Sequence, residues 1–436
     1  MKIGIFTDAY EPHISGVTTS IKMLKEALEK MHHEVFIVTA NLDGKGFKYD
    51  KKNKIIYMTG IKTGIYQTKL TGIYSSKAMK IIKSWNLDVI HSQTEFGVGY
   101  FSRIVAKKLN IPVVHTYHTL YEDYVHYVTH GHFNNLAKKL VIKMTKYYCE
   151  KKCDELIVPT DKIKDLFVNK YGIKKYANVI PTGIDTEKFK LNEEMKKEIT
   201  KIKKKYKIKD TDFVIGSVGR IAPEKSFDKL LYNIKDMVKV NNNIKVMLVG
   251  GGPELENLQK LTKELKLDSF VIFTDKVDYS VVPAYFNTFD VVVSFSTTET
   301  QGLTIIEGLA ASKPTICIND ESFTAMIEPN YNGYLFKNND EFKDYIFKLM
   351  NDDKLYKEMS INARNSIYKY SKEVFASDIL KVYHKAIKGH NKTSEDWCEP
   401  RLVDINKNPF IKKRKIIFLS DCWQISIMFT YLSFIS

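Results

Sequence analysis

The sequence predicts an α/β protein with two doubly wound domains, each built on a parallel sheet. Three observations predict this fold. The chain has 436 residues, 44% hydrophobic and 27% charged, which is enough material for two globular cores. Short apolar runs alternate with amphipathic segments, as they do in βαβ units. The alternation stops in a lysine-rich stretch at residues 193–209 and then begins again.

The apolar runs give the predicted strands and, with them, the domain boundaries. The first set comprises residues 3–6, 35–38, 55–58, 89–90, 113–114, 156–158 and 179–180, and the second comprises 213–217, 246–249, 271–273, 291–294 and 315–318. We therefore predict domains at residues 1–190 and 191–370, with 193–209 as a charged linker. Residues 371–388 should form a helix, because Phe375, Ile379 and Tyr383 recur at four-residue spacing. A basic and apolar tail of unknown role follows at 389–436.

Charge and cysteine content narrow the class of protein. The net charge of +16 favours acidic partners, namely nucleic acid, an anionic membrane or phosphate-bearing substrates. No nucleic-acid-binding module is recognisable, so we expect no nucleic-acid partner. Five scattered cysteines predict reduced thiols in a cytoplasm, and the first residues do not resemble a signal peptide. Residues 416–436 are long enough to span a bilayer but carry Asp421 and Gln424, so we do not expect a transmembrane helix.

Ligands of open α/β sheets bind at the carboxyl ends of the strands, so residues that follow a strand are the candidates. Arg220 and Lys225 follow the predicted strand at 213–217, and two cations at this place suit a diphosphate. The alternative is a pair of solvated surface cations. A glycine run at residues 250–252 follows the next strand, either as a plain turn or to leave room for a nucleotide.

The strongest pattern follows the strand at 291–294. Gly302 and Leu303 lie where a helix should begin, and a helix N-terminus offers N–H groups and a positive dipole end to a phosphate. Glu299 precedes this helix and could accept hydrogen bonds from sugar hydroxyls. Glu307 lies inside it among apolar neighbours, where an unpartnered carboxylate is costly, so we expect it to accept hydrogen bonds from a ribose. The alternative for Glu307 is an ordinary surface position on the helix.

Two loops of the first domain carry further candidates. Gly16 would let a phosphate or sugar approach the start of a helix, unless it is simply a turn glycine. His115, His118 and His126 follow or end the strand at 113–114, but their spacing matches no metal-ligand set, so we expect no metal. His118 is instead the candidate for a hydrogen bond to a reacting sugar. The Asp-Thr-Asp sequence at 210–212 precedes a strand, and we interpret it as a turn.

Together these motifs resemble the retaining family 4 glycosyltransferases, over roughly residues 1–388. That family has the GT-B fold, in which two Rossmann-like domains face each other across a cleft. The resemblance rests on the paired glutamates Glu299 and Glu307, the diphosphate-binding pair Arg220 and Lys225, the first-loop glycine Gly16, and His118 near the transferred sugar. It implies that Gly16, Gly302 and Leu303 also contact the donor diphosphate. The sequence departs from the family at Ser15, Thr182 and Gln301, where Gly, Asn and Phe are more usual.

The segments HTYHTLYEDYVHY and TETQGLT are similar to those of the bacterial diacylglycerol glucosyltransferases. This resemblance implies a hexosyltransferase that moves glucose from UDP-glucose to diacylglycerol with retention of configuration. It implies no cofactor and no metal, and a cytoplasmic enzyme held at the inner face of the cell membrane. A transferase with a soluble or polysaccharide acceptor, and a non-catalytic sugar-nucleotide-binding protein, are the alternatives.

A membrane acceptor would explain the excess of basic residues, because a basic surface binds an anionic membrane. Residues 134–152 combine lysines with Leu136, Leu140 and Met144 at four-residue spacing, as in a helix that lies on an anionic leaflet. Residues 61–85 are also basic and contain aromatic side chains. Either segment could equally be a solvated helix face.

Overall fold

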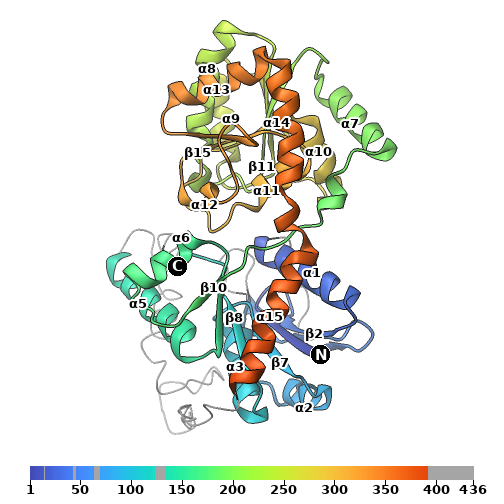
Figure 1. Cartoon of the computed structure of the whole chain (residues 1–436), viewed down its shortest axis with the longest axis vertical. Coiled ribbons are helices and arrows are strands. Elements are labelled where there is room, and N and C mark those ends of the chain that lie inside the picture. Colours follow the sequence, from blue (N-terminus) through green and yellow to red (C-terminus); the bar gives the residue numbers. More distant parts are fainter. Residues whose placement is uncertain (14, 43–45, 63–68, 121, 123–133, 391–436) are drawn as a thin grey trace. The chain divides into compact units, whose positions relative to one another are not determined.

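Figure 1 shows the computed structural model of the chain, which describes all residues except 14, 43–45, 63–68, 121, 123–133 and 391–436. The chain divides into two compact units. The first contains Met1–Val158, Ile163–Ile180 and the chain from Asp378 onward, and the second contains Pro159–Lys162 and Pro181–Ser377. Each unit is built on a predominantly parallel sheet with helices, so the predicted α/β class is confirmed.

Within its described residues, the first unit has an 8-stranded sheet in the order β10-β9-β8-β7-β1-β2-β4-β3. All neighbouring strands run parallel except β3 and β4. The strands are β1 (Lys2–Thr7), β2 (Glu34–Ala40), β3 (Lys48–Asp50), β4 (Ile55–Met58), β7 (Val89–Ser92), β8 (Val113–Thr116), β9 (Glu155–Val158) and β10 (Ala177–Val179). A separate antiparallel pair joins β5 (Gly60–Lys62) and β6 (Lys69–Thr71).

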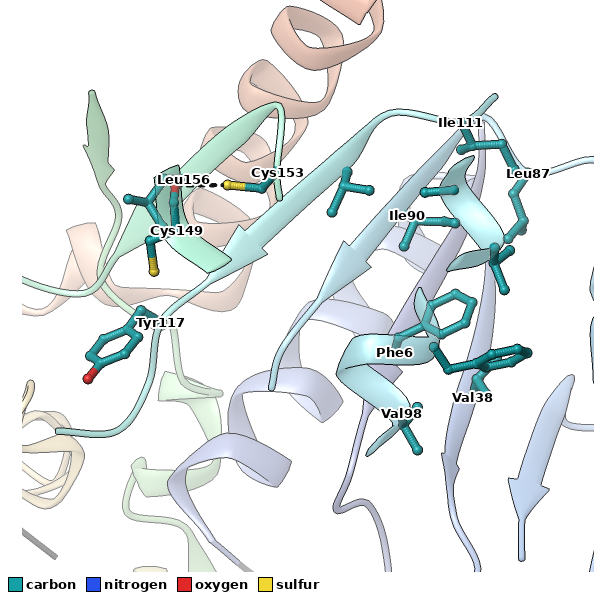
Figure 2. Packing of buried hydrophobic residues seen from close by; sticks show 14 of the residues in the cluster. Phe6, Val38, Leu87, Ile90, Val98, Ile111, Tyr117, Cys149, Cys153 and Leu156 are labelled. Atoms are coloured by element: carbon teal, nitrogen blue, oxygen red, sulfur yellow. Dashed lines mark hydrogen bonds between the residues drawn. The ribbon is translucent and has the colours of Figure 1, made fainter. Parts of the chain in front are cut away.

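The helices of the first unit include α1 (Gly16–Lys30), α2 (Ser76–Trp85), α3 (Gly97–Leu109) and α5 (Asn134–Lys146), while α6 (Asp161–Asp165) begins in the second unit and ends in the first. Two π-helical turns, η1 (Tyr147–Lys151) and η2 (Leu166–Lys170), extend α5 and α6. One core cluster contains Phe6 and Val38 from the strands with Val98 from α3, as Figure 2 shows. The strands are buried because side chains on both faces are covered, as in parallel sheets generally.

Within its described residues, the second unit has a 6-stranded parallel sheet in the order β13-β12-β11-β14-β15-β16. The strands are β11 (Phe213–Val218), β12 (Ile244–Val249), β13 (Val271–Phe273), β14 (Val291–Ser294), β15 (Thr315–Ile318) and β16 (Gly333–Phe336). The α-helices are α7 (Glu193–Tyr206), α8 (Phe227–Val240), α9 (Leu255–Glu264), α10 (Val282–Thr288), α11 (Leu303–Ala310), α12 (Glu321–Thr324), α13 (Asn339–Asn351) and α14 (Asp353–Ser366). Short 3₁₀ turns lie at η3 (Thr186–Phe189), η4 (Pro223–Lys225), η5 (Tyr279–Val281) and η6 (Tyr368–Tyr370).

The expected charged linker at residues 193–209 is wrong, because most of this stretch is the helix α7 of the second unit. Asn192 caps the helix, with its side chain accepting from the backbone N–H of Met195 at 2.8 Å. Acidic residues occupy the first turn and lysines the last, which suits the helix dipole. Met195, Ile202 and Tyr206 pack one face of α7 against a core of the second unit. The helix was not predicted because lysines outnumber the few apolar residues that mark its buried face.

The compact units and the predicted domains differ at residues 181–190. Ile184 and Phe189 are buried in a core of the second unit, so this segment belongs there. The helix expected at 371–388 is α15 (Lys372–His390), and Phe375, Ile379 and Tyr383 are all buried. The division between the units falls inside α15, between Ser377 and Asp378. The tail beyond residue 390 lies outside the described residues.

Within the part of the chain that the structure describes, no helix combines the length and the hydrophobicity that crossing a bilayer requires.

Candidate active site

The candidate residues of the second unit gather at one edge of its sheet. Strands β11, β14 and β15 are parallel neighbours, so their carboxyl ends point the same way. Arg220 and Lys225 follow β11, and Glu299 follows β14. All three residues therefore follow strand ends at one edge of the sheet, the edge at which open α/β sheets bind ligands.

Lys225 and Glu299 form an ion pair. Their side chains are 25% and 18% exposed, so the pair can still be reached by a ligand. Burial raises the pKa of Glu299, but the Lys225 ammonium opposes it, and the net effect lowers the pKa. Glu299 is therefore ionised at neutral pH. Arg220 lies on the same loop with its guanidinium 4.0 Å from Glu224, and its side chain is 35% exposed.

Helix α11 begins as the sequence predicts, with Gly302 as its N-cap and Leu303 as its first residue. Gly302 adopts φ 78°, the left-handed conformation that favours glycine. A Cβ at this position would lie 2.7 Å from the Phe323 ring. Because Gly302 has no side chain to cap the helix, the first N–H groups of α11 remain available to an anion.

Glu307 lies in the next turn of α11 and is only 5% exposed. The Tyr279 hydroxyl donates to Glu307 Oε1 over 3.3 Å. Desolvation by burial raises the pKa of Glu307 to about 7, and the Tyr279 hydrogen bond only partly opposes this. The structure thus excludes the alternative of an ordinary surface glutamate. A buried carboxyl of this kind is suited to hydrogen bonds from a polar ligand.

The glycine run at residues 250–252 is needed for close backbone packing. A Cβ on Gly250 would lie 2.0 Å from the carbonyl oxygen of Gly219, and one on Gly252 would lie 2.1 Å from that of Ile221. Gly250 also has φ +135°. These glycines let the loop after β12 press against the loop that carries Arg220.

We therefore expect Gly250→Ala to destabilise the protein by about 2 kcal/mol or more, from the clash together with the backbone strain. Urea unfolding of the purified variant measures this. Gly389→Ala is the control, since a Cβ there meets nothing within 4 Å, and its effect should stay within about 1 kcal/mol. Equal stabilities of the two variants would contradict the packing role of Gly250.

The remaining predicted residues, Gly16 and His118, belong to the first unit. Gly16 is the first residue of α1, next to Ser15, whose side chain accepts from the backbone N–H of Thr18 in a capping box. His118 follows β8 and is half-buried, with its Nε2 2.6 Å from Gln93 Oε1. Burial lowers the pKa of His118 to about 4, so the imidazole is neutral at pH 7. Nε2 then donates to Gln93, and Nδ1 is left as an acceptor.

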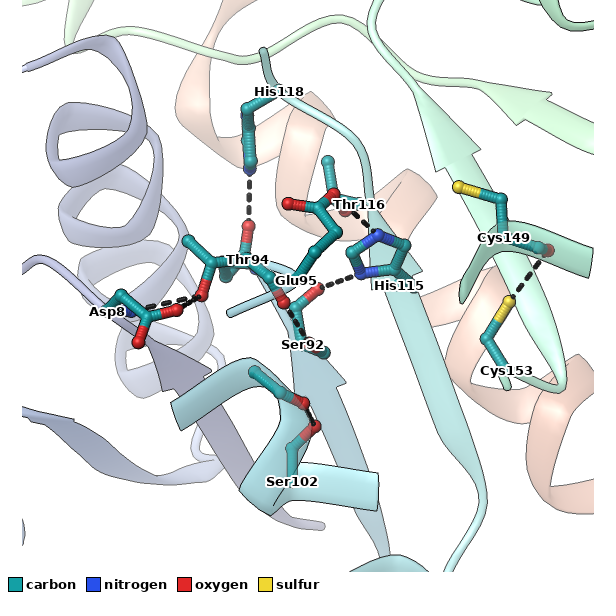
Figure 3. Close-up of polar contacts among 12 residues, drawn as sticks. Asp8, Ser92, Thr94, Glu95, Ser102, His115, Thr116, His118, Cys149 and Cys153 are labelled. Carbon is teal, nitrogen blue, oxygen red and sulfur yellow. Dashed lines mark hydrogen bonds and ion pairs between the residues drawn. The ribbon is translucent and has the colours of Figure 1, made fainter. Parts of the chain in front are cut away.

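A buried polar network beneath these loops was not predicted (Figure 3). His115 Nε2 lies 3.0 Å from Glu95 Oε1, and both side chains are almost fully buried. Asp8 accepts from the Thr94 hydroxyl at 2.5 Å and from the Val98 backbone N–H at 2.8 Å, at the start of α3. These contacts join the loops after β1 and β7 to each other and to His115 in β8, and the sequence signal for them is that Asp8, Thr94 and Glu95 come just after β1 and β7.

From the sequence we expect no metal at His115, His118 and His126. His115 Nδ1 lies 3.0 Å from the Ser92 carbonyl oxygen, so both of its ring nitrogens have protein partners. His126 lies outside the described residues. Among the residues that are described, no group of three or more His, Cys, Asp or Glu side chains could hold a metal ion. Asp210 and Thr211 form a turn, as interpreted from the sequence.

Among the residues that sequence reasoning missed, Tyr279 and Lys162 contact Glu307 and the Glu299 loop. Tyr279 reaches Glu307 from the loop after β13, and its position on a polar loop gave no signal. Lys162 contacts the backbone of the Glu299 loop, although it comes from the Pro159–Lys162 segment more than a hundred residues earlier. Such a contact depends on chain topology, which local patterns do not reveal.

Comparisons with known proteins agree with the fold and the family that the sequence resembles. Residues 14–188 match the family described as Glycosyltransferase Family 4, and residues 198–366 match Glycosyl transferases group 1. The chain is 35% identical to an alpha-monoglucosyldiacylglycerol synthase of Acholeplasma laidlawii, over 90% of this chain and 99% of that one. It is 33% identical to the synthase of the same name from Streptococcus pneumoniae, over 90% and 87% of the two chains.

Solved structures show the same fold at low sequence identity. The sucrose-phosphate synthase of Thermosynechococcus elongatus has a TM-score of 0.70 at 17% identity, covering 89% of this chain and 99% of that one. Anabaena HepE in complex with UDP-glucose has a TM-score of 0.66 at 16% identity, covering 88% and 100%. The two parallel-sheet units, the strand-end site and these relatives together show that the chain is a glycosyltransferase of family 4 with the GT-B fold.

Proposed function

We propose that this enzyme transfers glucose from UDP-glucose to 1,2-diacylglycerol and gives an α-monoglucosyl-diacylglycerol. The observation that carries the proposal is the 35% identity to the Acholeplasma laidlawii synthase along 99% of its length. The name of that relative supplies the acceptor, the product and the α configuration. UDP-glucose as donor is supported by the HepE complex and by the resemblance of the TETQGLT segment.

In this proposal the second unit binds the donor. Arg220, Lys225 and the N–H groups at Gly302 and Leu303 hold the diphosphate, because cations and a helix N-terminus both favour phosphate oxygens. Glu307 accepts hydrogen bonds from the ribose. Glu299 orients the glucose. His118 and Gly16 keep the roles that the family resemblance implies, a hydrogen bond to the sugar and a contact with the diphosphate.

The same groups account for the chemistry without a protein nucleophile. The acceptor hydroxyl attacks the anomeric carbon on the face from which the diphosphate leaves, and the leaving phosphate takes its proton. Lys225 and Arg220 stabilise the negative charge that develops on the diphosphate as the glycosidic bond breaks. Catalysis then rests on positioning and charge stabilisation, and the configuration is retained. No cofactor or metal takes part in the proposed reaction.

The most direct test of the donor is a panel of UDP-, GDP- and ADP-sugars offered with diacylglycerol vesicles. We expect UDP-glucose to give the highest initial rate of lipid glucosylation. A faster reaction with another nucleotide sugar would replace the donor in this proposal. Turnover only with a soluble or polysaccharide acceptor would replace the lipid, and binding without turnover would indicate a non-catalytic protein.

The proposal also requires the enzyme to reach a membrane. Helix α5 and η1 bury Val141, Met144 and Tyr148, whereas Lys138, Lys139, Lys143 and Lys151 are exposed. The predicted apolar stripe is partly wrong, because Leu140 is only half-buried and the buried face is rotated toward Val141. The exposed basic face supports peripheral binding of a cytoplasmic enzyme to the anionic inner leaflet.

Changing the four exposed lysines of α5 and η1 to Gln should therefore weaken vesicle binding. At about 1 kcal/mol per lysine near an anionic surface, the loss is up to about 10³-fold. Sedimentation with phosphatidylglycerol vesicles at low and high salt measures it. The control variant changes Lys196, Lys197, Lys201 and Lys204 of α7, which are equally exposed and alter the net charge equally. Equal losses in both variants would show that net charge alone drives binding.

A further inference from the structure

The loop at residues 296–302 carries Glu299 and Gly302 and has no regular structure, so its backbone needs partners from elsewhere. Two of its carbonyl oxygens, those of Thr297 and Thr300, accept from side chains of the Pro159–Lys162 segment, and a third, that of Glu299, lies within 3.5 Å of one. Thr160 Oγ1 donates to the Thr300 oxygen at 2.9 Å. Lys162 Nζ donates to the Thr297 oxygen at 3.1 Å and lies 3.5 Å from that of Glu299.

Lys162 is itself fixed by partners after β15. Its ammonium pairs with Asp320 Oδ1 at 2.7 Å and donates to Ser322 Oγ at 3.0 Å. Ser322 Oγ lies 2.6 Å from the Glu299 carbonyl oxygen, to which it donates. The side chains of Lys162 and Asp320 are only 18% and 15% exposed, so solvent screens the pair weakly. Lys162 and Ser322 thus both lie against the Glu299 carbonyl oxygen, and they are hydrogen-bonded to each other.

A second chain segment holds the other end of the loop. The Gln301 carboxamide pairs with both backbone groups of Thr182, accepting from its N–H at 2.9 Å and donating to its oxygen at 3.0 Å. Gln301 is 4% exposed and Thr182 5%, so this pairing is buried. The two positions are departures from the family pattern, and the structure brings them into contact with each other.

We propose that Lys162 and Gln301 are positioning residues that fix the Glu299 carboxylate against the donor sugar. The inference rests on the proposed function, since it takes Glu299 as the sugar contact. Lys162 and Gln301 hold backbone on either side of Glu299, while the Glu299 side chain is left to pair with Lys225. A shift of about 1 Å in such a group can cost up to about 10²-fold in rate.

The test compares affinity for UDP with affinity for UDP-glucose, because Glu299 contributes only to the sugar part. In Lys162→Met and Gln301→Met we expect UDP affinity to change less than about threefold. The preference for UDP-glucose should fall about tenfold and kcat about 10- to 100-fold. Lys162→Arg, which keeps the charge and donors, should recover part of the kcat. Calorimetric titration and initial rates with the full chain give these values.

Lys343→Met is the control. Lys343 pairs with Asp340 at 2.8 Å on α13, in the same unit but on a helix that carries neither this loop nor its partners. It removes a lysine ion pair as Lys162→Met does and should keep the sugar preference. The proposal is overturned if Lys162→Met and Gln301→Met keep wild-type kcat and preference, or if they lose UDP and UDP-glucose affinity in equal measure. Should Lys162→Met fail to fold, Gln301→Met decides alone.

Glu299→Gln separates this inference from the proposed function. If Glu299→Gln loses the sugar preference while the positioning variants keep it, only the positioning role fails. If Glu299→Gln itself keeps the preference, the assignment of Glu299 to the sugar is the part that fails.

Discussion

Lys225→Met and Glu299→Gln are each expected to lower kcat about 10²–10³-fold, the range seen when one stabilising group is removed from a reacting centre. Lys225 neutralises charge on the departing diphosphate, and Glu299 orients the sugar. Because the two side chains form an ion pair, removing either one also displaces the other. The double variant should therefore lose much less than the product of the single losses. Initial rates of lipid glucosylation with saturating donor measure all three.

Lys239→Met is the control for these variants. Lys239 also forms an ion pair, with Asp236, but the side chains are 64% and 59% exposed and lie at the end of α8. Its rate should match that of the wild type, since an exposed pair contributes little. Near-full activity in Lys225→Met or Glu299→Gln would contradict the assignment of the donor site.

Glu307→Gln should change stability and donor affinity in opposite directions. The pKa of the Glu307 carboxyl is about 7 in the folded protein, against 4.5 for the ordinary side chain. Between these values the folded state binds more protons than the unfolded state, so stability falls as the pH rises and levels off above pH 7. The difference corresponds to about 3 kcal/mol. Gln has no charge to bury, so the ligand-free variant should be more stable than the wild type at pH 8 and similar at pH 4.5.

The same substitution should weaken UDP binding about 10- to 100-fold at pH 8, because hydrogen bonds from the ribose to an ionised carboxylate are lost. Urea unfolding at the two pH values and calorimetric titration with UDP measure the two effects. Glu358→Gln, at an exposed position of α14, should change neither. If Glu307→Gln is no more stable than the wild type at pH 8, burial of an ionised Glu307 does not destabilise the ligand-free protein as expected. If it binds UDP as tightly as the wild type, Glu307 does not contact the ribose.

Much of the candidate site in the second unit could be predicted from the sequence, because its residues come soon after apolar runs that form strands. The apolar run at 291–294 and the glycine at 302 are local signals, and they set the end of β14 and the start of α11. The apolar neighbours of Glu307 likewise indicated burial, since a carboxylate among isoleucines and leucines in a helix has few solvated places.

Features that depend on distant contacts could not be predicted. The stripe of α7 has few apolar residues among many lysines, and its burial depends on α10. Strand β16 was not predicted from the sequence. It has only four residues and begins at Gly333, where a Cβ would lie 2.1 Å from the Thr315 carbonyl oxygen of the neighbouring strand β15. The roles of Lys162 and Gln301 could not be predicted, because their partners Asp320 and Thr182 lie more than a hundred residues away along the chain.

The configuration of the lipid product tests the central claim most directly. The enzyme is incubated with UDP-glucose labelled with ¹³C at the anomeric carbon and with diacylglycerol vesicles, and the extracted lipid is analysed by NMR. The account predicts a monoglucosyl-diacylglycerol whose anomeric signal is α, as in the donor. A β-linked product would contradict the front-face mechanism, and the absence of label from the lipid, with UDP-glucose still consumed, would contradict the acceptor.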